Sequence, residues 1–123
     1  MTALAEATLS DAERGVLDRA VTHLQREFGM RLRSIWLYGS RARGEASHAE
    51  SDVDLLVVLE RRHWKDDWEV HRVVSDAAES EGLSPVSFST QTYDVERIAQ
   101  RREIRSFFIQ EVDRDKIVLF GEP

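Results

Sequence analysis

Two short apolar runs, one ending at Tyr38 and one ending at Leu59, constrain the fold of this chain more than any other feature. Unbroken apolar runs of this length are typical of buried strands, so we predict strands over Arg31–Tyr38 and Asp52–Leu59. A polar loop over Gly39–Ser51 joins them. Side chains alternate along a strand, so Asp52 and Asp54 project to the same side. Two carboxylates that close repel each other unless a cation lies between them.

The remaining pattern predicts an α/β protein with a small mixed β-sheet flanked by helices. Ser10 and Glu13 have the spacing of a capping box, so the first helix begins at Ser10, and Gly29 follows its last apolar position. We expect residues 1–9 to form a disordered N-terminus and residues 10–123 a single domain. The other predicted elements are a helix of about 15 residues after His63 that stops at Gly82, a strand over Leu83–Ser89, a helical segment from about Thr90 that breaks near Arg101 and resumes through Val112, and a strand over Lys116–Phe120.

The composition excludes several classes of function. The 123 residues include no cysteine, which rules out disulfides, thiolate zinc sites and cysteine nucleophiles. The net charge of −6 argues against a general nucleic-acid binder, but not against a protein that binds one nucleotide with a metal ion. No apolar run approaches the roughly 18 residues of a membrane helix and no signal-peptide pattern begins the chain, so we expect a cytoplasmic protein without a membrane partner.

The loop after the first strand has features of a phosphate-binding turn. Gly39 permits a close approach of an anion, and a helical turn after Ser40 would direct backbone N–H groups toward it. Arg41 and Arg43 could donate bidentate hydrogen bonds to phosphate. Each feature also has an ordinary explanation, because Gly-Ser is a common turn and loop arginines often pair with acids such as Glu45.

Asp52 and Asp54 give the stronger signal. A lone Asp-x-Asp can be a turn residue followed by a solvent-facing strand residue. Here Asp54 lies within an otherwise apolar strand, where a carboxylate is costly without a cation or strong donors. Oxygen ligands favour Mg²⁺ or Mn²⁺, and substrate phosphates usually complete the coordination of magnesium. The loop and the strand therefore support each other as a site for a metal–nucleotide complex.

The segments Gly39-Ser40-Arg41-Ala42-Arg43-Gly44 and Ser51-Asp52-Val53-Asp54-Leu55-Leu56 resemble the signature of the minimal nucleotidyltransferases, in the DNA-polymerase-β superfamily. The resemblance implies a polymerase-β-like nucleotidyltransferase fold in which Gly39 and Ser40 hold the β- and γ-phosphates of an NTP such as ATP. Asp52 and Asp54 would hold two Mg²⁺ ions and act as the catalytic residues. An acceptor hydroxyl on a protein or an RNA would then receive NMP, with release of pyrophosphate. The resemblance also implies a small helical, toxin-like protein partner and an antitoxin role.

One departure from the family pattern favours an alternative. Active members generally carry a third carboxylate on a later strand, but the predicted strand Leu83–Ser89 has none, and Val86 or Ser87 takes its position. The alternative is therefore a catalytically degenerate subunit that binds a nucleotide or a partner. Other features stay open: a role for His48 in the loop, a basic run over Arg97–Arg105, core or partner-facing positions for Trp64 and Trp68, and a homo-oligomer.

Overall fold

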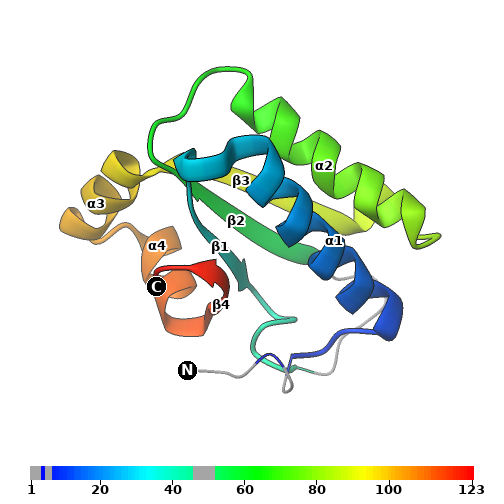
Figure 1. Cartoon of the computed structure of the whole chain (residues 1–123). Helices are drawn as coiled ribbons and strands as arrows, with labels where there is room; N and C mark the ends of the chain where they lie inside the picture. Colours follow the sequence, from blue (N-terminus) through cyan, green and yellow to red (C-terminus); the bar gives the residue numbers. More distant parts are fainter. Residues whose placement is uncertain (1–3, 5–6, 46–51) are drawn as a thin grey trace.

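The chain forms its elements in the predicted order of helix, strand, strand, helix, strand, helix, helix, strand. The computed structural model describes residue 4, residues 7–45 and residues 52–123 (Figure 1). The elements are α1 Asp11–Phe28, β1 Leu32–Tyr38, β2 Val53–Leu59, α2 Asp66–Ser80, β3 Phe88–Asp94, α3 Val95–Glu103, α4 Phe107–Asp115 and β4 Ile117–Gly121, with short 3₁₀ helices at Gly29–Arg31 and Pro85–Ser87.

Helix α1 begins where its capping box predicts. The Ser10 hydroxyl accepts a hydrogen bond from the Glu13 N–H at 3.1 Å, and the Glu13 carboxylate accepts one from the Ser10 N–H at 2.8 Å. These bonds satisfy two of the free N–H groups at the helix start. The buried stripe of α1 consists of Val16, Leu17, Ala20, Leu24 and Phe28.

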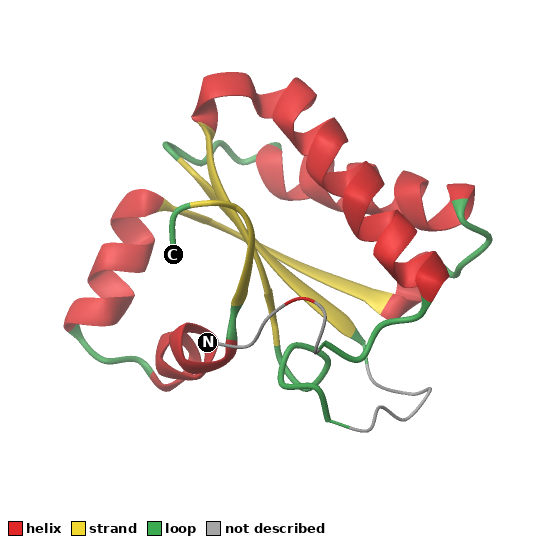
Figure 2. Cartoon of the chain, turned by 60° about the horizontal axis from the view of Figure 1, so that its bottom comes forward, coloured by secondary structure: helices red, strands yellow, loops and turns green. Residues whose placement is uncertain are grey.

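The four strands form one mixed sheet in the order β3-β2-β1-β4. Strand β1 is antiparallel to both β2 and β4, whereas β2 is parallel to β3. Helices α1 and α2 cover one face and α3 and α4 cover the other (Figures 1 and 2). Along β2, Val53, Leu55 and Val57 pack toward the first pair of helices, while Leu56 and Val58 pack toward the second. The predicted fold class is confirmed, and β2 is a central strand buried on both faces.

The prediction for the third strand was wrong in its position. It was placed at Leu83–Ser89 with a helix from Thr90, but β3 runs over Phe88–Asp94 and α3 begins only at Val95. Pro85 lies in a 3₁₀ turn that the Ser84 hydroxyl caps by accepting from the Val86 N–H. The polar sequence of β3 gives little strand signal. Its strand conformation comes from continuous parallel pairing with β2, from Val53 opposite Phe88 to Leu59 opposite Asp94.

Of the two positions left open for the tryptophans, core or partner-facing, the structure excludes the core. Trp64 and Trp68 are 82% and 63% exposed. The buried stripe of α2 instead consists of Val70, Val73, Val74, Ala77 and Ala78, together with the ion-paired Asp66. Both indoles therefore lie on the surface.

The residues immediately before α1 pack against the loop after β1. Ala7 is buried, and the Thr8 N–H donates to the Arg41 carbonyl at 2.9 Å. The Thr8 hydroxyl donates to the Glu45 carbonyl at 2.7 Å. Two carbonyl groups of the loop after β1 thus accept hydrogen bonds from Thr8. No helix among the described residues has both the length and the apolarity to span a bilayer.

The exposure of Trp68 predicts that it contributes little to stability. We expect Trp68→Ala to change the unfolding free energy by less than about 0.5 kcal/mol, as for most surface substitutions. Leu56→Ala, at a fully buried position of β2, should cost about 2–5 kcal/mol. Urea denaturation of the two variants measures both values. A loss of more than about 2 kcal/mol in Trp68→Ala would contradict the surface position, because that loss is typical of a buried side chain.

Candidate functional site

The turn after β1 brings Gly39 and Ser40 to one end of the sheet. Gly39 has a φ of +82°. The carbonyl of Gly39 accepts from the Ala42 and Arg43 N–H groups, and the carbonyl of Ser40 accepts from the Glu45 N–H. The chain therefore makes a helix-like turn directly after Ser40, as the sequence predicts.

Pairing between β1 and β2 sets Asp54 against this turn. In the antiparallel register, Tyr38 lies opposite Asp54. A Cβ atom added to Gly39 would collide with the Asp54 Oδ2 atom. Glycine is therefore favoured at position 39 for two reasons, its positive φ and its close contact with the carboxylate. The two motifs that sequence analysis singled out meet in the structure.

The environment of the Asp54 carboxyl group disfavours its charged form. Its burial and the charge of Asp52 raise the pKa of Asp54 to about 6, although Arg41 and Arg43 act in the opposite direction. A carboxylate in this state gains from a bound cation, because a cation would offset both the lost hydration and the repulsion.

A cavity of about 310 Å³ lies beside this pair of motifs. Its lining comes from the end of β1, the turn, β2 and α4: Tyr38, Gly39, Ser40, Arg43, Asp54, Phe108, Glu111, Val112 and Asp115. Sequence reasoning missed the residues from α4. Their spacing of three and four identifies one helix face, but nothing local indicates that this face borders the turn. Among the described residues, the lining includes three carboxylates and one arginine.

Asp52 borders a different cavity. It is exposed immediately before β2 and lines a space of about 400 Å³ together with residues of α2 and β3. Asp54 lines the first cavity, so the aspartate pair lies between the two spaces.

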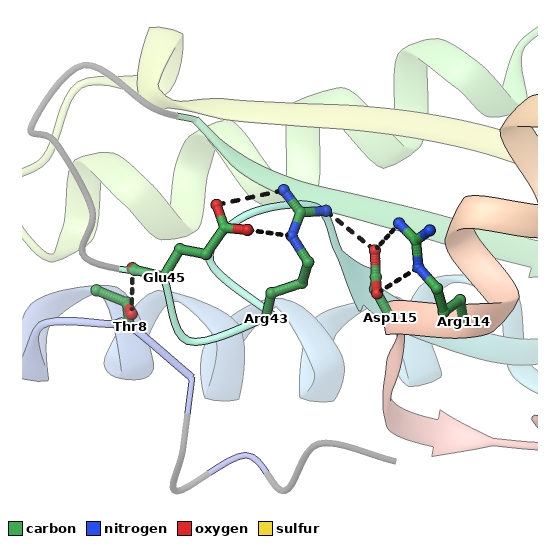
Figure 3. A network of polar contacts seen from close by, with 5 residues as sticks. All are labelled: Thr8, Arg43, Glu45, Arg114 and Asp115. Carbon is green, nitrogen blue, oxygen red and sulfur yellow. Dashed lines mark hydrogen bonds and ion pairs between the residues drawn. The ribbon is translucent and has the colours of Figure 1, made fainter.

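Arg43 ties the turn to helix α4 (Figure 3). Its guanidinium donates to Glu45 at 2.7 Å and to Asp115 at 3.0 Å, and these two acids raise its pKa. Arg114 also donates to Asp115 at 3.0 Å. Hydrogen bonds from Arg114 and Arg43 hold the pKa of the buried Asp115 below its usual value, against the effect of burial. Arg43 borders the cavity, as expected for a phosphate ligand, and its guanidinium is hydrogen-bonded to Glu45 and Asp115.

Arg41 contacts the segment around the start of α1. Its side chain is 8% exposed and donates to Glu13 at 2.8 Å and to the Thr8 carbonyl at 3.0 Å. Burial would raise the pKa of Glu13, but hydrogen bonds from Arg41 and Ser10 leave it lowered. Through these contacts the Arg41 guanidinium joins the turn to the start of α1.

The strand register shows which residue of β3 lies beside Asp54. Ser89 of β3 lies directly opposite Asp54 of β2. Val86 and Ser87, the expected positions of a third carboxylate, lie in the 3₁₀ turn immediately before β3. In the described part of the chain, no group of three or more histidines and acids lies close enough to hold a metal ion. A metal here would have two protein carboxylates, with the remaining ligands from substrate or water.

The other candidates contribute less to this site. His48 lies outside the described residues. In the basic run, Arg97 stacks over Tyr93 at 4.4 Å, and Arg102 pairs with Asp113 at 2.8 Å. These two arginines make contacts within α3, α4 and β3 rather than with the cavity.

Comparison with known families agrees with this geometry. Residues 17–115 match the model of the nucleotidyltransferase domain family. The match covers more than half of the chain, so this protein belongs to the nucleotidyltransferase domain family. A comparison with curated protein sequences gave no match.

Three solved structures have a similar fold. A candidate nucleotidyltransferase from Sulfolobus solfataricus gives a TM-score of 0.52 at 20% identity, with 90% of this chain and 84% of that chain covered. A toxin–antitoxin complex with AMP-PNP gives 0.52 at 21% identity, covering 84% and 72%. A mutant of the toxin–antitoxin pair MntA–HpeT gives 0.52 at 19% identity, covering 83% and 71%. At these identities the similarity concerns the fold.

The contact between Gly39 and Asp54 predicts a site-specific effect of a methyl group. Gly39→Ala and Gly82→Ala should each lose about 1–2 kcal/mol of unfolding free energy, because both glycines have a positive φ. Gly82 is a matched control, since no atom lies within 4 Å of a Cβ built on it. Gly39→Ala should lose more unfolding free energy than Gly82→Ala, because its methyl group also displaces the Asp54 carboxylate. Only Gly39→Ala should shift the ¹³C carboxyl resonance of Asp54. An unchanged Asp54 resonance would contradict the contact.

The ion pairs of Asp115 predict a pH-dependent stability. Its lowered pKa means that the carboxylate stabilises the fold above the ordinary aspartate pKa of about 3.9, and that this contribution disappears as the pH falls through the lower folded-state pKa. Asp115→Asn should cost about 1 kcal/mol at neutral pH, and the difference from wild type should shrink below about pH 4. Denaturation at several pH values tests this. Asp67→Asn, which removes an exposed ion pair, is the control, and an equal effect of both substitutions would contradict the prediction.

Proposed function

We propose that this protein binds an Mg²⁺–NTP complex, most simply Mg-ATP, and transfers NMP to a hydroxyl group of a protein or RNA acceptor with release of pyrophosphate. The observation that carries the proposal is the packing of the Gly39–Ser40 turn against Asp54 beside a cavity. A phosphate-binding turn and a metal-binding carboxylate must be adjacent for this chemistry, and here strand pairing makes them neighbours. The nucleotidyltransferase family match supports the same reaction class.

The residues present fit a divalent metal. Burial and the negative charge of Asp52 both disfavour the charged form of the Asp54 carboxyl group, and a bound cation would stabilise that form. The cavity lining is also rich in acids. We propose that Asp52 and Asp54 would hold Mg²⁺, or Mn²⁺ in its place. When bound, the metal would neutralise charge on the transferring phosphate and orient it.

The turn would bind the phosphates that leave. The Ser40 hydroxyl borders the cavity and can donate a hydrogen bond to a phosphate oxygen, while Gly39 lets the phosphates approach the backbone closely. Arg43 would add a cationic donor by exchanging one of its bonds to Glu45 and Asp115 for a bond to phosphate.

The partner we propose is a small helical, toxin-like protein, for which this chain would act as the antitoxin. Two solved structures of similar fold are toxin–antitoxin complexes, one of them with AMP-PNP. The composition favours the cytoplasm as its location.

A second candidate function is a degenerate subunit that binds a nucleotide or partner without turnover. Ser89 favours it, because serine stands opposite Asp54 where active relatives would carry a carboxylate. A serine hydroxyl is a poor proton acceptor and a weaker metal ligand than a carboxylate.

Removal of the Asp54 carboxylate tests the proposed site. We expect Asp54→Asn to lower the Mg²⁺-dependent affinity for ATP at least tenfold, about 1.4 kcal/mol, and to abolish transfer of labelled AMP to a co-purified partner. Titration calorimetry with and without Mg²⁺ measures binding. Asp67→Asn, a charge removal on the exposed start of α2, is the matched control and should bind as wild type does.

The outcomes separate the two candidates. Mg²⁺-dependent ATP binding by wild type without transfer to any tested acceptor would favour the degenerate subunit. Binding and transfer that survive Asp54→Asn would refute the proposed site altogether.

A further inference from the structure

The two edges of the sheet differ in how they are protected against pairing with a further strand. Strand β4, at one edge, has five residues, and its pairing with β1 shifts register between Ile35 and Trp36. It ends at Gly121, which has a φ of +80°. Short length and irregular pairing are devices by which proteins prevent a sheet edge from binding another chain. The β4 edge is therefore poorly suited to accept a strand.

The β3 edge is longer, regular and almost uncharged. Strand β3, Phe88–Asp94, has seven residues and pairs with β2 continuously along its length. Its sequence contains no proline, lysine or arginine, and its one charged residue is the terminal Asp94. That carboxylate accepts a hydrogen bond from the Arg97 N–H at 2.8 Å and so caps α3. In the part of the chain that the structure describes, the outer backbone groups of β3 have no strand partner.

Exposed apolar side chains flank the β3 edge. A cavity of about 400 Å³ beside it has a lining that includes Val86, Phe88 and Thr90, together with His71 of α2. Val86, in the turn before β3, is 84% exposed. Trp68 precedes His71 by three residues, which places both on one face of α2, and Trp68 is 63% exposed. The β3 edge and this face of α2 therefore form one surface, with backbone polar groups beside apolar side chains.

We infer that this surface joins two copies of the chain. Strand β3 of each copy pairs antiparallel with β3 of the other and continues the sheet across a two-fold axis. Pairing that uses all seven residues is centred on Gln91, the middle residue of β3. The inference goes beyond the proposed function and does not depend on it, because it concerns the assembly of the protein and not its reaction.

The sequence of β3 suits pairing with itself. In the register centred on Gln91, Thr90 lies opposite Thr92 of the second copy, and paired threonines stabilise neighbouring strands. Asp94 lies opposite Phe88 of the second copy. The two aspartates therefore stand at opposite ends of the paired strands, where their mutual repulsion is weak. The one charge in β3 thus does not oppose the pairing.

Two-fold pairing would also cover the apolar side chains beside the edge. Helix α2 packs on β3 in each copy, so the antiparallel arrangement brings the two α2 helices to the same face of the continuous sheet. Every contact occurs twice in such an interface, so Trp68 and Val86 of both copies can be removed from water. The pairing closes both β3 edges, which would otherwise be open to aggregation.

A charge placed at the centre of the pairing tests the interface. We expect the wild-type protein to sediment at micromolar concentrations with twice the 14.2 kDa mass of the chain. Gln91→Lys should raise the dissociation constant of the dimer at least about tenfold, because it sets two lysines directly opposite each other. His23→Lys adds the same charge on the exposed surface of α1. It is the matched control and should dimerise as wild type does.

A disulfide trap tests the register. The chain has no cysteine, so a single introduced thiol can react only with the same thiol of another copy. In the proposed register the two Cα atoms of residue 91 are about 4.5–5.5 Å apart, within the range of a disulfide. Gln91→Cys should therefore form a covalent dimer rapidly under mild oxidation. His23→Cys, whose thiol is also exposed, is the control and should cross-link only slowly.

The outcomes decide between this interface and others. Circular dichroism checks that Gln91→Lys folds, and the trap decides the question if it does not. A wild-type monomer, or a dimer that a folded Gln91→Lys leaves intact, overturns the β3 interface. Equal cross-linking of Gln91→Cys and His23→Cys overturns the register. A chain that is monomeric alone and binds a different protein through β3 overturns the homodimer.

Discussion

The antiparallel pairing of β1 with β2 is the constraint on which the candidate site depends. One register places Tyr38 opposite Asp54 and thereby sets the Gly39 backbone against the Asp54 carboxylate. A shift by one residue would turn Asp54 to the opposite face of the sheet and put Val53 or Leu55 in its place. The register is fixed because Leu55 and Val57 pack under α1 and α2 while Leu56 and Val58 pack under α3 and α4. Packing on both faces thus holds a carboxylate where burial raises its pKa to about 6.

Two arginines hold the turn that completes the site. Arg41 joins it to the start of α1 through the buried contact with Glu13, and Arg43 joins it to the end of α4 through Asp115. The turn is thereby attached to elements that cover opposite faces of the sheet. The positive charges of Arg41 and Arg43 favour the charged form of Asp54, yet burial and the charge of Asp52 outweigh them. A further cation would therefore stabilise the charged form of Asp54, and this is the physical basis for proposing a metal–nucleotide site.

The position of β3 connects the proposed function with its alternative. Because β3 starts at Phe88, the residue beside Asp54 is Ser89, and no acid stands at that place. A site with two carboxylates is consistent with nucleotide binding alone, and turnover would require a base from elsewhere. The two candidate functions therefore differ in whether a base for turnover is available, while both use the same turn and aspartates.

The sequence by itself determined the features that follow from neighbouring residues. The capping box at Ser10 and Glu13 set the start of α1, the apolar runs set β1 and β2, and the Gly-Ser and Asp-x-Asp motifs marked the candidate site. Only the tertiary structure decided which distant groups meet. It placed β3 by pairing with β2, exposed Trp64 and Trp68, turned Arg41 toward Glu13, and brought Phe108, Glu111 and Asp115 of α4 to the cavity. Caps and periodicity depend on residues within one or two turns of each other. Strand register and helix packing depend on contacts between segments far apart in the chain, and no local pattern encodes those contacts.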